Sequence, residues 1–61
     1  MPYVNIRIAN TLSREQKARS AAEITDTLER IAHKPASYTY IVFDEVTDEN
    51  WAIAGKLLDD S

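Results

Sequence analysis

The chain has 61 residues, no cysteine and one histidine, and its formal net charge is −3. A domain of this length buries only about 60% of the surface that its unfolded chain exposes, so its own core gives marginal stability. Neither disulfides nor a metal site can supplement that core, which makes self-association the expected remedy. The acidic balance offers no basic stripe for a phosphate backbone, so nucleic acid is not an expected partner.

The N-terminal residues lack the order of a secretory signal, and no apolar run reaches the roughly 18 residues that a membrane span needs. Together with the absence of cysteine, this predicts a cytoplasmic protein with no membrane partner. The hydrophobic fraction of 44% argues against a disordered tail. We expect residues 1–61 to form a single domain.

The first predicted element is a strand. From Tyr3 to Ile8 apolar and polar residues alternate, with Val4 and Ile6 on the same face as Ile8. A period of two residues is typical of a strand that has one face covered.

A helix should follow this strand. Ser13 and Gln16 stand three residues apart and match a capping box, which marks a helix start. His33 and Lys34 suit a helix C-terminus, and Pro35 cannot extend the helix. Between these ends the apolar residues recur at three- and four-residue spacing, which predicts one core-facing stripe. The stripe consists of Ala21, Ile24, Leu28 and Ile31, flanked by Ala18 and Ala32.

The segment from Tyr38 to Phe43 is aromatic and β-branched, which predicts a second strand with both faces covered. Two strands joined by a helix form a right-handed β-α-β unit with parallel strands, so the predicted fold class is α/β. Polar residues 44–50, an apolar run at 51–53 and then Gly55 fit a loop and a C-terminal hairpin or arm. One helix leaves one sheet face bare, which again predicts self-association.

The chain resembles the 4-oxalocrotonate tautomerase family over nearly its whole length. The resemblance is carried by Pro2 after the initiator, by the helix entry LSREQK at 12–17, and by DE at 44–45 followed by NWAIAG at 50–55. It implies a β-α-β subunit assembled as a trimer of dimers, with active sites at subunit boundaries. It also implies an N-terminal proline that acts as the base in cofactor-independent proton transfer between carbon and oxygen of keto and enol acids.

Pro2 is the candidate catalytic residue. Once Met1 is removed, its nitrogen is a secondary amine, and a free α-amino group has a pKa of about 7.7–8.0. While Met1 is attached, that nitrogen is a tertiary amide without basicity. The structural alternative is that Pro2 merely begins a strand, where it has no ladder hydrogen bond to lose.

The expected pocket around the Pro2 amine is apolar, with Trp51, Phe43 or Tyr40 as its walls and Arg7 nearby. Desolvation and a neighbouring cation both disfavour the ammonium form, so such a pocket would lower the pKa of the amine towards neutrality. In this hypothesis Trp51 excludes water, while Arg7 and Tyr40 orient a substrate oxygen.

Members of the family typically place an arginine before the helix and another in the second strand, where each holds a substrate carboxylate in two places. Here Leu12 and Tyr40 occupy those positions. A dicarboxylate substrate is therefore disfavoured relative to a monocarboxylate or an uncharged carbonyl compound. Arg7 is the best remaining carboxylate anchor, with an ion pair to another subunit as an equal alternative. For Tyr40 the alternative is interface packing.

The remaining polar residues give weaker signals. The dehalogenating relatives carry a glutamate in the arm, which residues 51–54 lack. Asp44 and Glu45 are predicted to be solvated or capping groups at a strand end. His33 is explained by its place at the helix end.

The leading hypothesis is an isomerase without cofactor or metal that acts on a small carbonyl or 2-oxo acid compound. One alternative is a non-catalytic subunit with this fold in a homo- or hetero-oligomer. Another is a nucleophilic amine that forms an iminium with a carbonyl substrate.

Overall fold

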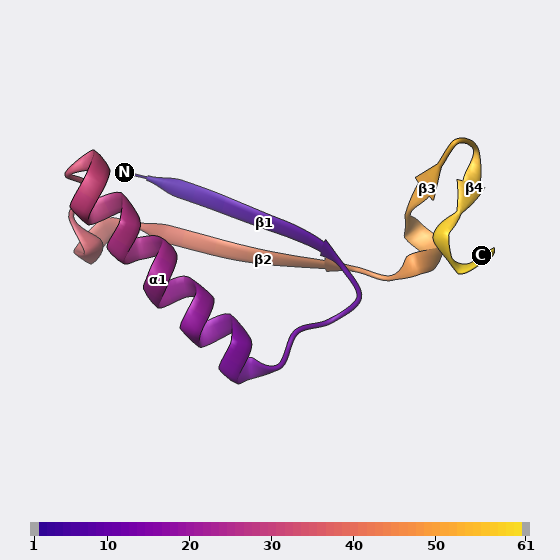
Figure 1. The fold of residues 1–61 in the computed structure, drawn as a ribbon, viewed down its shortest axis with the longest axis horizontal. Helices are drawn as coiled ribbons and strands as arrows, with labels where there is room; N and C mark the ends of the chain where they lie inside the picture. The colour runs from indigo at the N-terminus through magenta and orange to yellow at the C-terminus, as the bar shows by residue number, and fades with distance from the viewer. Residues whose placement is uncertain (1, 61) are drawn as a thin grey trace.

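The computed structural model describes residues 2–60 of the chain. Strand β1 (Tyr3–Ala9), helix α1 (Arg14–Ala32) and strand β2 (Tyr40–Val46) form one β-α-β unit. The strands pair in parallel, from Tyr3 opposite Tyr40 to Ala9 opposite Val46. Figure 1 shows the helix crossing the sheet as the connection between them. The predicted α/β fold class is confirmed.

Both ends of α1 are confirmed where the sequence predicts them. The Gln16 N–H donates to Ser13 Oγ at 3.1 Å, and the Ser13 N–H donates to Gln16 Oε1 at 2.9 Å, which completes the capping box. At the other end His33 adopts a left-handed conformation with φ of 57°. The N–H groups of His33 and Lys34 both donate to the Leu28 carbonyl, which satisfies one of the open carbonyls of the last turn.

The second strand begins and ends later than predicted. Residues Ala36–Tyr38 form a 3-10 turn, which the Thr39 side chain closes by donating to the Pro35 carbonyl at 2.9 Å. Pro35 therefore starts a turn that uses the first residues of the aromatic and β-branched run.

Asp44 and Glu45, predicted at a strand end, lie inside β2 instead. Each is paired with a cation on another element: Asp44 with Arg7 of β1 and Glu45 with Lys17 of α1. These long-range pairs give two acidic residues partners in a strand that composition alone would end earlier.

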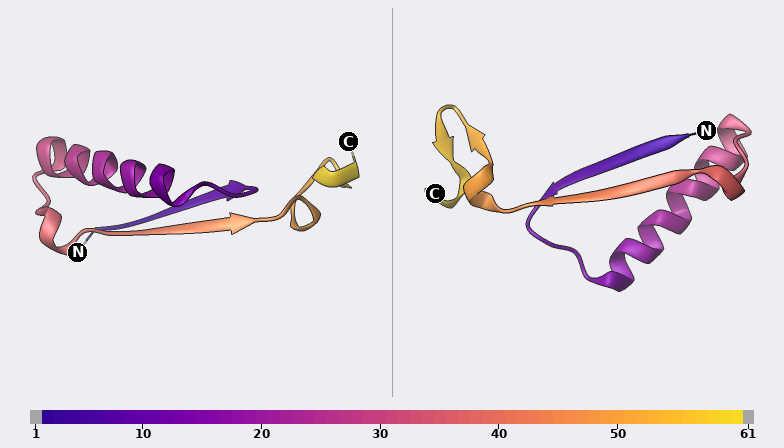
Figure 2. Two further views of the ribbon diagram at one scale, coloured as in Figure 1. Left: turned by 90° about the horizontal axis from the view of Figure 1, so that it is seen from below. Right: turned by 180° about the vertical axis from the view of Figure 1, so that it is seen from behind.

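The helix covers one face of the sheet and leaves the other face bare (Figure 2). The less exposed residues Val4, Ile6 and Ile8 of β1 form the helix-facing side, as predicted. The opposite side is called the open face below. It consists of Tyr3, Asn5, Arg7 and Ala9 of β1 together with Tyr40, Val42 and Asp44 of β2.

The open face is strongly exposed in a single chain. Tyr3 and Tyr40 have relative exposures of 61% and 56%, and no described residue counts as buried. The expected cover on both faces of the second strand is therefore present on one face only. Ile31, predicted in the core-facing stripe, is also exposed, since it lies in the last helical turn.

A short hairpin forms the predicted C-terminal arm. Strands β3 (Ala52–Ile53) and β4 (Lys56–Leu57) pair antiparallel. Ala54 and Gly55 connect them, both with positive φ, as the favoured two-residue hairpin turns require. Figure 1 shows the arm beyond the end of β2, away from the helix. The Cα radius of gyration is accordingly 14.7 Å, against about 10.5 Å for a compact domain of this length.

None of the helices in the described part of the chain combines the length and the apolar composition that crossing a membrane requires.

Glu45 fastens the helix entry to the sheet. Its carboxylate accepts a hydrogen bond from the Leu12 N–H at 2.8 Å and another from Lys17 Nζ at 2.7 Å. These two contacts hold the loop before α1 and its first turn against β2. The hydrogen bond from Lys17, followed by the one from the Leu12 amide, holds the pKa of Glu45 below its ordinary value.

Replacing Glu45 should destabilise the protein in a pH-dependent way. At pH 7 Glu45→Gln should melt at a lower temperature than the wild type, because a neutral amide loses the pair with Lys17. Since folding lowers the pKa of Glu45, this stabilisation is complete above the ordinary glutamate pKa of about 4.3. It is lost as the pH falls through the lower pKa of the folded state, so the melting temperatures should converge in acid.

Circular dichroism melts at fixed protein concentration, recorded across this pH range, measure the convergence. Glu49→Gln is the matched control, because Glu49 is exposed and makes no side-chain hydrogen bond with another described residue. A Glu45→Gln deficit that stays constant with pH, or one equalled by Glu49→Gln, would contradict the assignment.

Candidate functional site

The sheet divides the predicted site residues into two pairs. Pro2 and Tyr40 lie together at the start of the two strands, where the Tyr40 N–H donates to the Pro2 carbonyl at 3.0 Å. Pro2 is half-buried, whereas the Tyr40 side chain is on the open face. This hydrogen bond fixes the backbone of Pro2 and leaves its ring nitrogen outside the ladder.

Arg7 and Trp51 come together at the other end of the strands. They line a cavity of about 210 Å³ with Asp44, Val46 and Asn50. We call it the Arg7–Trp51 cavity. Arg7 and Trp51 are predicted site residues, whereas Asp44, Val46 and Asn50 are not.

The two pairs cannot share one small-molecule site within a single chain. Arg7 follows Pro2 by five positions, and five steps of extended chain place the two residues about 17 Å apart along the direction of β1. Phe43, considered as a wall of the Pro2 pocket, alternates with the open-face residues and belongs to the helix-facing side. Phe43 therefore does not lie on the open face of its own chain, and its place in the Pro2 pocket stays a prediction.

Trp51 is held rigidly at the edge of the cavity. Its Nε1–H donates to the Val46 carbonyl at 3.1 Å, and the same carbonyl accepts the Asn10 N–H at 3.0 Å. At the base of the arm, the Leu58 N–H donates to the Trp51 carbonyl at 3.0 Å. The indole is thus fixed to the end of β2 on one side and to the arm on the other.

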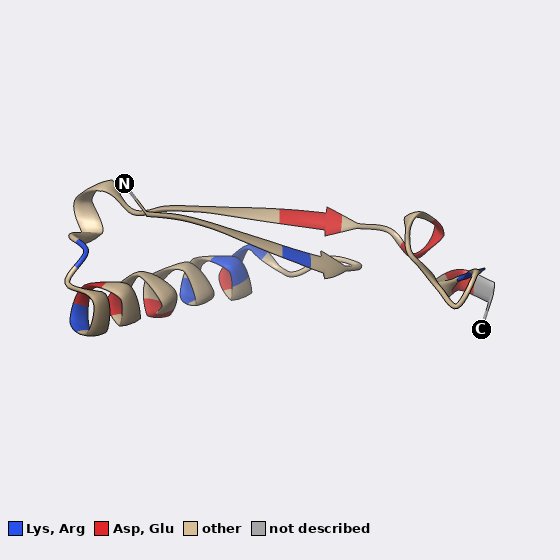
Figure 3. Ribbon diagram, turned by 90° about the horizontal axis from the view of Figure 1, so that it is seen from above, with Lys and Arg blue, Asp and Glu red and all other residues tan. Residues whose placement is uncertain are grey.

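The charge of Arg7 is already paired inside the chain. Its Nε–H donates to Asp44 Oδ2 at 3.0 Å, and the two side chains are 59% and 40% exposed. Figure 3 shows the basic band of β1 beside the acidic end of β2. The partner predicted from the sequence is a substrate carboxylate or an acidic residue of another subunit, whereas the structure places the partner within the same chain. Asp44 can be identified as the partner of Arg7 from the parallel register, which places the two residues opposite each other.

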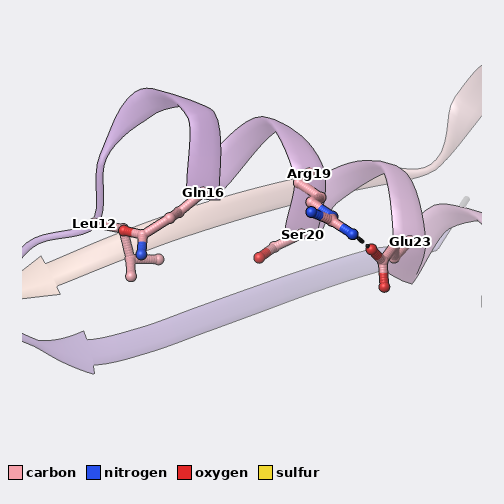
Figure 4. Close-up of a pocket in the computed structure, with 5 residues that line it drawn as sticks. All are labelled: Leu12, Gln16, Arg19, Ser20 and Glu23. Atoms are coloured by element: carbon pink, nitrogen blue, oxygen red, sulfur yellow. Dashed lines mark hydrogen bonds and ion pairs between the residues drawn. The ribbon is translucent and has the colours of Figure 1, made fainter.

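A second cavity of about 290 Å³ lies along the helix. Its lining consists of Leu12, Gln16, Arg19, Ser20 and Glu23. Figure 4 shows these side chains in a row, with Arg19 and Glu23 bonded to each other. Their Nε to Oε2 distance is 3.2 Å. Of these lining residues, only Leu12 stands at a position where the family pattern has an arginine. Its side chain is apolar.

His33 lies at the C-cap of α1, as predicted. Among residues 2–60, no three His, Cys, Asp or Glu side chains are grouped closely enough to hold a metal ion.

Comparison with known proteins identifies the family. The sequence model described as tautomerase enzyme matches residues 2–61. The chain belongs to the tautomerase family. It is 39% identical over 57 residues to Probable tautomerase K2 of Dickeya dadantii (strain 3937), a match that covers 92% of this chain and 85% of the relative. The resemblance predicted from Pro2 and the motifs is confirmed, and membership makes this chain an isomerase.

Solved structures agree on the fold. YwhB, a homologue of 4-oxalocrotonate tautomerase, superposes with a TM-score of 0.90 at 23% identity and 98% coverage of each chain. A heterohexamer 4-oxalocrotonate tautomerase from Chloroflexus aurantiacus J-10-fl superposes with a TM-score of 0.86 at 22% identity, covering 98% of this chain and 97% of that one.

Trp51→Phe tests the anchor of the arm in this tautomerase. The variant keeps an aromatic ring but loses the hydrogen bond to Val46, so the free energy of unfolding should fall by about 0.5–1.5 kcal/mol. Urea unfolding at fixed protein concentration, followed by circular dichroism because Trp51 is the only tryptophan, measures this. Tyr38→Phe, which removes a hydroxyl without a hydrogen bond to another described residue, should be neutral. Equal stability of both variants would contradict the anchor.

Proposed function

We propose that this chain is a cofactor-independent tautomerase in which Pro2, freed by removal of Met1, is the general base. The amine takes a proton from an enol hydroxyl or from a carbon beside a carbonyl, and it returns the proton to another atom of the same conjugated system. No atom is gained or lost, so a single group that accepts and releases one proton is sufficient. Met1 itself lies outside the described residues.

Family membership over residues 2–61, with a proline at the first matched position, is the observation that carries this proposal. The local geometry supports it. The Tyr40 N–H fixes the Pro2 backbone through its carbonyl, while the pyrrolidine ring restricts the direction of the nitrogen lone pair. A base held in this way loses less conformational entropy on reaction than a lysine does.

The complete site is proposed to be shared between copies of the chain. A general base acts within about 3 Å of its proton, whereas the Arg7–Trp51 cavity of the same chain lies about 17 Å from Pro2 along the strand. A neighbouring copy that covers the open face supplies that cavity to Pro2. The exposed Tyr3 and Tyr40 side chains give such a contact a large apolar area.

Within the shared site each residue has a proposed role. Trp51, fixed by Val46, excludes water and provides an apolar wall that favours the neutral amine. The Tyr40 hydroxyl donates to the carbonyl or enolate oxygen of the substrate, and Arg7 lies near the same oxygen. The proposed substrate is a small carbonyl or 2-oxo acid compound, because Leu12 and Tyr40 replace the two arginines that would hold a diacid.

A non-catalytic subunit is the second candidate. The absence of both arginines and the pairing of Arg7 with Asp44 support it, since no described residue brings an unpaired guanidinium to the Arg7–Trp51 cavity. The heterohexameric relative from Chloroflexus aurantiacus is a member with more than one type of chain. In this case the chain completes an oligomer whose chemistry is carried out by another subunit.

Pro2→Ala separates these two functions. The intact mass of the purified protein is measured first and should show that Met1 is absent. Ketonisation of enol phenylpyruvate, followed by ultraviolet absorbance, should then be about 10²-fold slower in Pro2→Ala than in the wild type. Pro35→Ala, the other proline of the chain, is the matched control and should retain the wild-type rate. Equal rates for the wild type and Pro2→Ala would favour the non-catalytic subunit.

Self-association is tested on the open face. Sedimentation velocity should give a hexamer, six times the chain mass of 6.9 kDa. Val42→Glu places a charge on the open face and should shift the distribution towards smaller species, because an unpaired buried charge is costly. Ala22→Glu adds the same charge to an exposed position of α1 and should leave the mass unchanged. A stable wild-type monomer would contradict the shared site.

A further inference from the structure

The Arg7–Trp51 cavity contains a cation that is neutralised before any substrate arrives. Arg7 Nε and Asp44 Oδ2 are 3.0 Å apart, which is a charge-assisted hydrogen bond. The contact is built into the sheet, because Arg7 and Asp44 are register partners on adjacent strands of the open face. Both side chains line the cavity. A ligand there meets a pair of zero net charge.

In the described part of the chain, Arg7 is the one cation that lines this cavity. Its remaining members are Val46, Asn50 and Trp51, and the Asn50 amide already donates to Thr47 Oγ1 at 3.1 Å. Lys17, Arg19 and Arg30 are paired with acidic residues elsewhere on the helix or at its contact with the sheet. Among residues 2–60, only Arg7 lines the cavity as a countercharge for a carboxylate, and its positive charge is already balanced by Asp44.

We propose that Asp44 is a specificity-determining residue that makes this cavity select uncharged carbonyl compounds over carboxylates. This inference rests on the proposed function, and it narrows the substrate class of the same site. A ligand carboxylate meets repulsion from Asp44 and a guanidinium with one donor occupied. A neutral carbonyl oxygen can accept from the remaining N–H groups of Arg7 without displacing Asp44. The wall formed by Trp51 suits the apolar part of such a ligand.

Trp51 allows binding to be measured separately from catalysis. It is the only tryptophan of the chain and lines the cavity, so its fluorescence reports a ligand there. The purified, assembled protein is titrated with phenylacetate and with phenylacetamide, which are similar in shape and differ in charge. The wild type should bind phenylacetamide about tenfold more tightly, the ratio that one charge-assisted contact supplies.

Two variants should move the binding preference in opposite directions. Asp44→Asn leaves Arg7 without its carboxylate and should shift the ratio of the two dissociation constants about tenfold towards phenylacetate. Arg7→Gln leaves the Asp44 charge unopposed and should shift it further towards phenylacetamide. The double variant Asp44→Asn/Arg7→Gln should lose the shift towards phenylacetate that Asp44→Asn alone produces. Asp59→Asn, which removes one exposed negative charge in the C-terminal turn, should leave the ratio unchanged.

The inference is overturned if the wild type and Asp44→Asn give the same ratio, or if Asp59→Asn shifts it as much as Asp44→Asn does. Far-ultraviolet circular dichroism and sedimentation establish that each variant is folded and assembled. If Asp44→Asn does not fold, Arg7→Gln decides, and an unchanged ratio in that variant overturns the inference. Failure of the proposed function is recognised separately, as ketonisation that does not depend on Pro2.

Discussion

The parallel register of β1 and β2 is the constraint on which the rest of this structure depends. It places Tyr3 opposite Tyr40 and Arg7 opposite Asp44. The pairing of Tyr3 with Tyr40 places Pro2 at one end of the sheet, where its carbonyl accepts the Tyr40 N–H. The pairing of Arg7 with Asp44 forms an ion pair without net charge at the other end. A slip by one residue would exchange the two faces of a strand. It would turn Arg7 towards the helix and dismantle the cavity that it shares with Trp51.

The same register leaves the protein short of a core. One helix and two strands offer a single covered layer, and no described residue is buried in the isolated chain. Polar contacts therefore help to position the helix on the sheet. Glu45 holds the start of the helix against β2 by accepting hydrogen bonds from Leu12 and Lys17. Such contacts fix geometry more than they supply free energy, because partly exposed ion pairs contribute little. The exposed open face leaves room for further apolar burial between copies, and in the proposed assembly the same contacts would bring together the two halves of the site.

Local sequence signals predicted the helix and the strands. Long-range pairs determined the limits of β2 and the partner of Arg7, which the sequence did not predict. The capping box of Ser13 and Gln16 is a short-range motif, so the start of α1 was predictable. The limits of β2 were not, because a turn after Pro35 shortens one end and cation partners lengthen the other. Arg7 was recognised as a candidate anchor, but its partner Asp44 is 37 positions away. Residue composition and periodicity carry no information about such a pair, and only the strand register reveals it.

The substitutions that distinguish this chain from the family pattern act on the charge of the site in one direction. Leu12 and Tyr40 stand where the family pattern has arginines, so the proposed shared site has two cations fewer, and within the Arg7–Trp51 cavity Asp44 pairs with the cation that is present. In such a site a developing enolate is stabilised by hydrogen-bond donors rather than by net positive charge. A neutral ligand pays a smaller desolvation cost on entering an apolar site than a carboxylate does. The proposed base, Pro2, would also stay unprotonated more readily in apolar surroundings. The absence of the two arginines is therefore consistent with the neutral substrate that we propose.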